Sequence, residues 1–264
     1  MKILLLITTL TIFLFSNSAE DTFEKKCSTC HKGYIAQSQL IKNYEQNNSL
    51  FKLKAPTLTE LSFALRDQIG DRMGDKESQL MEIEDFLKNY LSDPNKKRSI
   101  LSKSVTRHFE TMPKMKGKLK DEEIEALASY MFDYSEEMIA KHSVKRYSYE
   151  DALKKAKAED KIVLIEGYII FCRGCMMMDR EVFVEDVVKE ALDKDFVFVK
   201  ENMLKEKLPF GMKSMGTPSF YFITNDGKKV IDKIQGMGTV DEFLELLDEI
   251  KSALKKGEFV IDKS

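Results

Sequence analysis

The chain has 264 residues, of which 43% are hydrophobic and 33% are charged, a composition that suits a soluble protein with buried cores. Its 42 basic and 44 acidic residues nearly cancel, so the charge excess typical of nucleic-acid-binding proteins is absent, and we expect no nucleic-acid partner. This length predicts two domains. The four cysteines form two Cys-x-x-Cys pairs far apart in the chain.

The start of the chain has the layout of a secretory signal peptide. A lysine is followed by the apolar run 3–15, and small residues then allow cleavage after Ser18 or Ala19. The run is shorter than the roughly 20 residues that a transmembrane helix needs. We therefore expect residues 1–19 to be a signal, the mature protein to be periplasmic, and no stable membrane span to remain. An uncleaved anchor is the alternative.

The next motif, Cys27-Ser28-Thr29-Cys30-His31, is the signature of covalent c-type haem attachment. Each cysteine sulfur would add to one haem vinyl group, and the His31 imidazole would be the proximal iron ligand. A zinc site is one alternative, but it needs two more cysteine or histidine ligands at suitable spacing, and the chain has only three histidines. A chance Cys-x-x-Cys followed by a surface histidine is the other alternative.

Apolar residues at helical spacing, together with capping residues, predict the helices up to residue 138. Residues 32–53 read as loop with some helix. A later helix must end before Pro94, because proline cannot continue it. Asp121 is a good N-cap for the last helix of this part. The predicted helices cover residues 20–26, 59–69, 80–91 and 121–137.

Residues 20–138 resemble a class I monohaem cytochrome c, on the basis of the Cys-x-x-Cys-His motif, of Met112-Pro113 and of the last helix. In that family the methionine before the proline is the sixth iron ligand, which transfers to Met112. A thioether ligand raises the haem potential, and Pro113 stiffens the chain that holds it. Met115 and then His108 are the other candidates, and Met112 as a core filler is the structural alternative.

The same resemblance implies two further contacts. The carbonyl of Pro56 would accept a hydrogen bond from the imidazole of His31. Because the first and last helices of the family cross, Phe23 would meet the face that carries Leu127 and Tyr130.

A second pattern begins after a charged segment, residues 139–147, which predicts a linker that includes His142. Residue 148 opens a region in which helices alternate with β-branched apolar runs, as in α/β domains. Asn225-Asp226-Gly227 is a strong hairpin signal. The predicted helices are 149–158, 176–193 and 240–254, and the predicted strands are 161–165, 196–199, 219–223 and 230–234.

This order, with Cys172-Arg173-Gly174-Cys175 ahead of a helix, resembles a thioredoxin fold over residues 148–256. The resemblance implies that Pro218 is the cis-proline beside the disulfide and that Glu166 holds the position of the buried acid. The family usually has aspartate at that position, and tryptophan where this chain has Phe171.

The second cysteine pair predicts thiol–disulfide chemistry. Cys172, at a helix start beside Arg173, would be the attacking thiolate, and Cys175 would resolve the mixed disulfide. Glu166 would carry the proton of Cys175 through water. A static disulfide, a docking surface without redox activity and a solvent-paired Glu166 are the alternatives.

These readings predict a signal (1–19), an all-α cytochrome c domain (20–138), a linker (139–147), an α/β thioredoxin-like domain (148–256) and a tail (257–264). One covalent haem c would carry electrons, beside a dithiol that makes the chain a candidate thiol–disulfide oxidoreductase. The partners would be redox proteins: an electron donor or acceptor and a thiol substrate protein. The alternatives are a plain electron-transfer cytochrome with a docking module, and a thiol reductase in cytochrome maturation.

Overall fold

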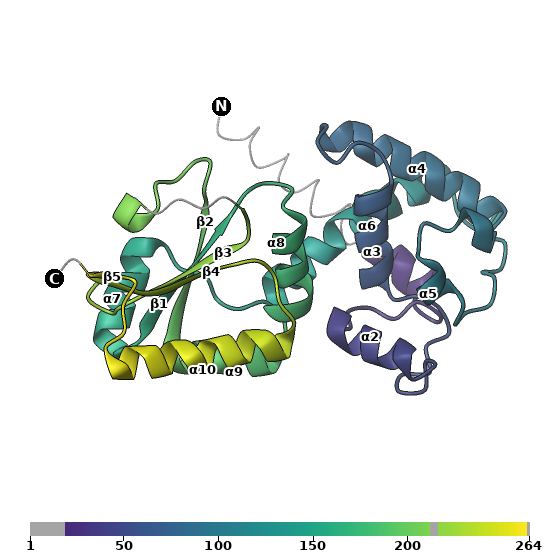
Figure 1. Cartoon of the computed structure of the whole chain (residues 1–264). Helices are drawn as coiled ribbons and strands as arrows, with labels where there is room; N and C mark the ends of the chain where they lie inside the picture. The colour runs from purple at the N-terminus through teal and green to yellow at the C-terminus, as the bar shows by residue number, and fades with distance from the viewer. Residues whose placement is uncertain (1–18, 212–215, 263–264) are drawn as a thin grey trace, which may run out of the picture. The chain divides into compact units, whose positions relative to one another are not determined.

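The computed structural model of the protein describes residues 19–211 and 216–262 (Figure 1). The chain forms two compact units, Met1–Ala140 and Lys141–Ser264. The predicted signal peptide lies outside the described residues except for Ala19, which belongs to a helix. Across the described residues, no helix has the length and apolar character that a membrane span requires.

The first unit consists of helices joined by loops, and its described residues contain no β-strand (Figure 1). The four predicted helices are present, and α2 lies in the stretch that was predicted as loop with some helix. The short elements η1 and α5 were not predicted. The helices cover residues 19–26, α2 (Gln37–Glu45), α3 (Leu58–Gln68), α4 (Lys76–Ser92), η1 (Lys96–Arg98), α5 (Lys103–Thr106) and α6 (Asp121–His142).

Side-chain caps define where these helices begin. Thr57 caps α3 in a capping box with Glu60, in which each side chain bonds the backbone of the other residue. The Asp75 side chain accepts a hydrogen bond from the backbone N–H of Ser78 at the start of α4. The α6 helix has three acidic residues in its first turn, where the helix dipole favours negative charge.

The core of the first unit lies where the helix of residues 19–26, α3, α4 and α6 meet. Phe23 is 2% exposed, and its ring lies 6.0 Å from that of Tyr130, centroid to centroid. Leu127 belongs to the same cluster, so the predicted contact of Phe23 with this face of α6 is confirmed. Each such buried side chain contributes about 1.5–3 kcal/mol.

The second unit is built around a five-stranded sheet of order β2-β1-β3-β4-β5. The β1 and β2 strands pair in parallel, and the other neighbours pair antiparallel. The elements are α7 (Tyr149–Glu159), β1 (Ile162–Tyr168), α8 (Arg173–Met177), η2 (Met178–Val182), α9 (Asp186–Asp195), β2 (Phe196–Asn202), η3 (Pro209–Gly211), β3 (Ser219–Ile223), β4 (Lys229–Gln235), α10 (Val240–Lys256) and β5 (Ile261–Asp262).

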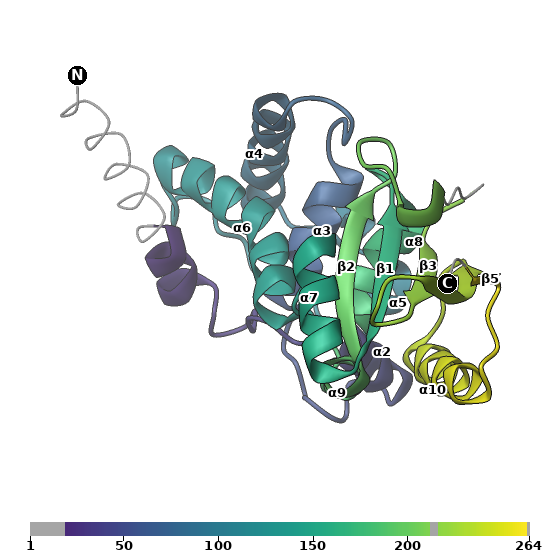
Figure 2. The same ribbon diagram turned by 90° about the vertical axis from the view of Figure 1, so that its left-hand side faces the viewer.

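Both faces of this sheet are covered, which explains why the central strands are continuously apolar. Ile162 and Leu164 face one core together with residues of η2, α9 and α10. Val163 and Ile165 face a second core together with residues of α7. Figure 2 shows α7 and α10 on opposite sides of the strands. The second unit therefore has three layers, and its predicted α/β class is confirmed.

The segment predicted as a linker, residues 139–147, is part of the folded structure. The α6 helix continues to His142, and the N–H of Val144 donates to the carbonyl of Phe183 at 2.9 Å. Tyr147 forms a parallel bridge with Val199 of β2. The apolar side chains of Val144 and Tyr147 pack on the cores of the second unit, which gives this charged segment its fixed course.

Two other predicted boundaries differ from the structure. The helix predicted over 176–193 begins at Arg173 and is interrupted after Val182, because Phe183 turns inward and is completely buried among other aromatic rings. The predicted tail contains β5, which pairs with β4. A strand of two residues is too short for any periodic pattern to indicate it.

Candidate functional site

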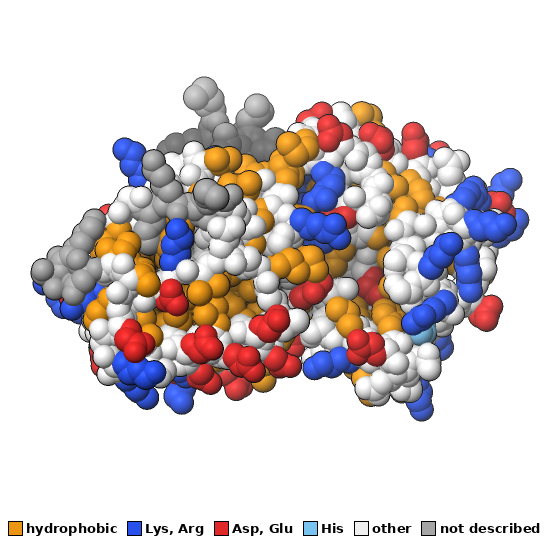
Figure 3. Space-filling model, viewed as in Figure 1, with side chains coloured by type: hydrophobic (Ala, Val, Ile, Leu, Met, Phe, Trp, Pro, Cys, Tyr) orange, Lys and Arg blue, Asp and Glu red, His pale blue; other side chains and the backbone are white. Residues whose placement is uncertain are grey.

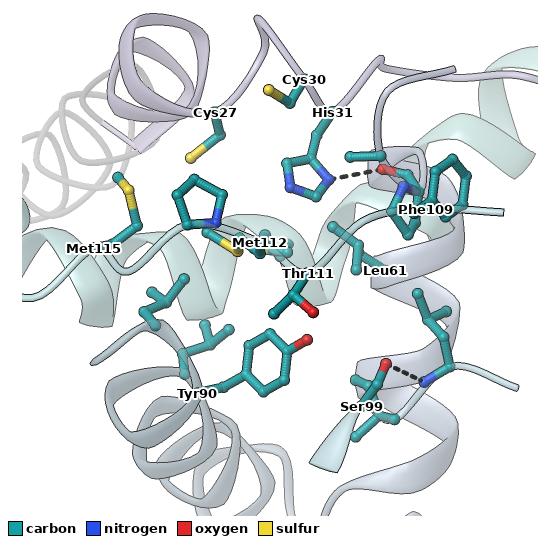
Figure 4. Close-up of a pocket in the computed structure, with 18 of the residues that line it drawn as sticks. Cys27, Cys30, His31, Leu61, Tyr90, Ser99, Phe109, Thr111, Met112 and Met115 are labelled. Carbon is teal, nitrogen blue, oxygen red and sulfur yellow. Dashed lines mark hydrogen bonds between the residues drawn. The ribbon is translucent and has the colours of Figure 1, made fainter. Parts of the chain in front are cut away.

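A largely apolar cavity of about 290 Å³ lies in the first unit (Figure 4). The haem-attachment motif borders it with Cys27, Cys30 and His31, and the segment Thr111–Pro113 borders it too. In Figure 4 the His31 imidazole and the Met112 side chain both point into the cavity, from segments far apart in the chain. Its apolar lining includes Phe23, Leu61, Leu65, Phe86, Leu127 and Met131.

The His31 imidazole is oriented by a single hydrogen bond. Its Nδ1 lies 2.7 Å from the carbonyl oxygen of Pro56, as the family resemblance predicted. Because a carbonyl can only accept, Nδ1 carries the proton and the lone pair of Nε2 is left for a metal. Burial lowers the pKa of His31, although the bond to Pro56 opposes this. The neutral imidazole that a metal requires is therefore favoured.

The two thiols lie on the turn that joins the first helix to His31. The N–H groups of Cys30 and His31 both donate to the carbonyl of Cys27, at 3.1 and 2.9 Å. Both cysteines are free; Cys27 is half-buried and Cys30 is exposed. Burial raises the pKa of the Cys27 thiol to about 11. Two thiols, a free imidazole nitrogen and thioether sulfurs around one apolar cavity are the donor set that suits a covalently bound haem.

The three candidates for the sixth ligand do not share one environment. Met112 and Met115 both line the cavity. The His108 ring instead stacks on Tyr44, with centroids 5.0 Å apart, and its Nε2 accepts a hydrogen bond from Arg107 at 3.2 Å. The geometry thus favours a methionine over His108.

The zinc alternative finds no support in the part of the chain that the structure describes. Within residues 19–211 and 216–262, no cluster of three or more histidine, cysteine, aspartate or glutamate side chains is arranged to hold a metal ion.

Basic side chains gather on the surface of the first unit near α5 and the end of α4 (Figure 3). Lys26, Lys54 and Lys96 line the cavity. Residues 94–120 contain nine basic residues and one acidic residue, Glu110. Since the whole chain carries a formal net charge of only −2, this excess is local.

The second site lies at the start of α8, where Cys172 and Cys175 form a disulfide. Cys172 is the N-cap of α8, and its Sγ accepts a hydrogen bond from the N–H of Cys175 at 3.1 Å. The Thr217–Pro218 peptide bond is cis, as the resemblance implied. A Cβ atom on Gly174 would lie 2.9 Å from Pro218 Cδ, so the proline loop and the helix start approach too closely for a side chain there.

The surface beside the disulfide is apolar. Ile170 and Phe171, directly before Cys172, are 50% and 45% exposed, and Met237, which lies against Gly174, is 50% exposed. Exposed apolar side chains next to a reactive group are typical of a protein-binding surface.

Glu166 lies on β1, completely buried, on the sheet face that η2, α9 and α10 cover. Its Oε2 forms an ion pair of 3.1 Å with Lys200 Nζ. The same ammonium group donates to both oxygens of Asp179, at 2.8 and 2.7 Å, and Arg146 donates to Asp179 at 2.6 Å. Burial raises the pKa of Glu166 and Asp179 adds to the rise, whereas Lys200 and Arg146 oppose it.

Sequence reasoning missed the partners of Glu166. Lys200 follows Phe196 and Phe198 with the alternation of a strand, so a signal existed: a charged residue on the buried face of β2. Asp179 and Arg146 carried no comparable signal.

Two family models match this chain, and their matches overlap within α6. Residues 16–131 match the family model described as cytochrome c oxidase, cbb3-type, subunit III. Residues 125–210 match the Thioredox_DsbH model, described as a protein of unknown function, DUF255. No match to this chain was found among curated proteins.

Several solved structures are similar to the second unit. A thioredoxin from Thermus thermophilus is 24% identical, with a TM-score of 0.40, covering 44% of this chain and 94% of that one. The reduced C-terminal domain of DsbD from Neisseria meningitidis is 22% identical, with a TM-score of 0.33 and coverage of 38% and 91%. A DsbH oxidoreductase is 19% identical, with a TM-score of 0.32 and coverage of 43% and 85%.

The family models describe a cytochrome c domain for the helical unit and a thioredoxin-like domain for the unit with the disulfide. The chain combines a cytochrome c domain with a thioredoxin-like domain.

Proposed function

We propose that this chain is an exported protein that joins one-electron transfer at a covalent haem c to thiol–disulfide exchange with a partner protein. The observation that carries the proposal is the apolar cavity that Cys27, Cys30 and His31 border, with the Nε2 atom of His31 left free. The signal-like residues 1–19 support export to the periplasm, where bacterial c-type haem is attached and where disulfides persist.

Four residues would hold the haem. Cys27 and Cys30 would bond it through sulfur, and His31 Nε2 and Met112 Sδ would bind the iron. A haem bound in this way supplies reversible one-electron chemistry, at a potential raised by the thioether ligand. The basic residues at the cavity mouth favour an acidic redox partner and speed its association.

The dithiol chemistry needs only this chain and its partner. In the reduced protein, the Cys172 thiolate would attack a disulfide of the partner and release one partner thiolate. Cys175 would then attack Cys172 Sγ, which forms the Cys172–Cys175 disulfide and releases the second partner thiolate. Glu166 would accept the proton of Cys175 through water. Pro218 would border the mixed disulfide, beside the apolar surface at Phe171.

The two sites differ in potential. Thioredoxin-like pairs lie at roughly −120 to −270 mV, and Met/His ligation raises the haem potential, so electrons would run downhill from the dithiol to the haem. One-electron oxidation of a dithiol passes through a radical, which favours the alternative that the two sites serve separate partners.

An optical spectrum and an intact mass of the exported protein test the haem proposal. We expect a coloured protein whose mass exceeds that of the processed chain by one haem. The Met112→Ala variant should lose the absorption band of methionine–iron ligation, and its matched control Met115→Ala should keep it. A colourless protein with the mass of the bare chain contradicts the proposal, and loss of the band in the control alone transfers the ligand to Met115.

The exposed apolar side chains beside the disulfide suit a protein partner both in thiol exchange and in docking without redox activity, and cysteine variants distinguish the two. Cys172→Ser should abolish exchange with a protein disulfide. Cys175→Ser should instead trap the partner as a mixed disulfide, and trapped apocytochromes would identify the role as a reductase in cytochrome maturation. A wild-type protein that shows no exchange, and so does not differ from Cys172→Ser, would leave the plain electron carrier.

A further inference from the structure

A buried carboxylate lies one peptide group away from the His31 imidazole. Glu60, in the first turn of α3, is only 5% exposed. Its Oε2 accepts hydrogen bonds from the N–H and the hydroxyl of Thr57, at 2.8 and 2.9 Å. Its Oε1 accepts a hydrogen bond from the Tyr44 hydroxyl at 2.7 Å. All of these groups can donate, which is the environment of an ionised carboxylate.

The hydrogen bonds of Glu60 and of His31 meet in one peptide group. The N–H that donates to Glu60 belongs to Thr57, and the carbonyl that accepts from His31 Nδ1 belongs to Pro56. These two residues share a peptide bond, whose N–H and C=O are conjugated. A continuous line of polarisable bonds therefore runs from the Glu60 carboxylate to the His31 ring.

Such a line has a definite electronic effect. A negative charge at the N–H end draws the amide proton and increases the electron density on the carbonyl oxygen, because hydrogen bonds in a chain strengthen one another. The Pro56 oxygen then pulls harder on the Nδ1 proton of His31. The imidazole gains electron density at Nε2, as ligating histidines do when the outer hydrogen-bond partner is a stronger acceptor.

Helix capping alone does not account for the burial of Glu60. The chain contains a second capping box of the same geometry, Thr239 with Glu242 at the start of α10. There both residues are exposed, and the hydrogen bonds to Thr239 lower the pKa of Glu242. Burial raises the pKa of Glu60 instead, although its three donors oppose the rise. The α3 box thus bears a desolvation cost that capping does not require.

We propose that Glu60 sets the electron affinity of the haem iron by acting on His31 through the Pro56–Thr57 peptide. The inference rests on the proposed haem ligation by His31. Glu60 does not border the haem cavity, so it is a positioning residue. Its effect is to make the imidazole a stronger donor and to stabilise the ferric state.

The Glu60→Gln holoprotein tests this proposal. Glutamine keeps the size of the side chain and can accept from Thr57 while donating to Tyr44, so it removes the charge and spares the capping box. We expect the ferrous state to gain about tenfold in a spectroelectrochemical titration at neutral pH, which is about 59 mV for one electron. The NMR signal of the His31 Nδ1 proton in the ferrous protein should move upfield, and the bands of both axial ligands should stay.

Glu123→Gln is the matched control. The Glu123 carboxylate accepts a hydrogen bond at 2.8 Å from Lys26, a residue of the cavity lining. Glu123→Gln therefore removes one negative charge beside the cavity and leaves the hydrogen bonds from Glu60 through the Pro56–Thr57 peptide to His31 unchanged. Partly exposed charges are screened, so we expect a change of less than about twofold. If the potential shifted as much in the control as in Glu60→Gln, the loss of a nearby charge would explain the effect, and the proposal would be overturned.

A second variant keeps the test decisive if Glu60→Gln does not fold. Tyr44→Phe removes one competing donor and leaves the carboxylate a stronger acceptor from Thr57. At alkaline pH, where the carboxylate stays ionised, the potential should move in the opposite direction, in favour of the ferric protein. Coloured variants with the wild-type potential contradict the role of Glu60. A colourless wild-type protein would instead contradict haem attachment itself.

Discussion

At the scale of single residues, both sites depend on buried polar groups whose partners come from distant parts of the chain. Tyr44 and Glu60 are 16 residues apart, Asp179 and Lys200 are 21 apart, and Arg146 and Asp179 are 33 apart. Each carboxylate accepts a hydrogen bond from at least one donor that no local pattern links to it. A buried ionic cluster of this kind is costly to assemble, and a substitution that leaves one of its charges without a partner is strongly destabilising.

Glu166 should oppose stability and favour activity. Its pKa is raised by burial, so the folded state holds its proton more tightly than the unfolded chain does. Stability therefore falls as the pH rises from the ordinary pKa of a glutamate toward the raised one. Glu166→Gln removes this pH-dependent loss of stability. Lys200 still donates both of its hydrogen bonds to Asp179. We expect higher stability at neutral pH by chemical denaturation.

The same variant should slow exchange with a small disulfide at neutral pH by about tenfold to hundredfold, because the proton acceptor of Cys175 is lost. The rise of the wild-type rate with pH through the raised pKa should also disappear. A variant that is less stable and equally fast would assign Glu166 a purely structural role. Exchange kinetics across pH, measured on reduced protein, distinguish the two cases.

At the scale of elements, the start of α8 and the loop of Pro218 pack closely because Gly174 has no side chain. The close approach is a contact between a helix and a loop that are 44 residues apart, from Gly174 to Pro218. The sequence motif indicates a redox site, but the packing that makes glycine necessary belongs to the tertiary fold.

Gly174→Ala should force these two elements apart. The new methyl group would meet Pro218 Cδ, which belongs to a rigid ring and cannot move aside alone. Overpacking of this kind costs about 1–3 kcal/mol. We expect a lower midpoint in denaturant and slower exchange with a protein disulfide. Gly211→Ala is a useful comparison for the unfolding measurement, because a Cβ there meets no atom within 4 Å but carries the strain of a φ of +66°.

The elements that the sequence predicted well are those with local signals. The haem motif occupies five consecutive residues, and α3, α4, α6, β1 and β3 have clear caps or apolar runs. The boundaries that differ depend on tertiary contacts. Val144 and Tyr147 lie in a charged segment, and only their packing on the second unit shows that they belong to it. The break after Val182 likewise follows from the burial of Phe183.

At the scale of the whole molecule, each unit has its own core, and the boundary between them falls after Ala140. Residues 143–147 belong to the second unit by their contacts: Val144 with Phe183, Tyr147 with Val199, and Arg146 with Asp179. A domain limit drawn at the composition change near residue 148 therefore cuts through a folded structure.

A fragment of residues 143–264 should be more stable than one of residues 148–264. The shorter fragment loses the buried Val144 side chain, the Tyr147 bridge and the Arg146 ion pair, which together predict a loss of about 2–4 kcal/mol. Urea denaturation of both fragments measures it. Val144→Ala in the longer fragment should lower the free energy of unfolding by part of this amount. Equal stability of the two fragments would show that residues 143–147 are dispensable.

The cavity in the helical unit has a consequence for the resistance of the protein to proteolysis. Apolar walls that enclose about 290 Å³ lose contacts as long as nothing fills them, and a group that binds the folded state alone adds its binding free energy to folding. Under the proposed function, a chain without its haem would unfold locally more often and expose backbone to proteases. Under the proposed function, proteolytic lifetime would measure haem attachment, and copies without haem would be degraded first.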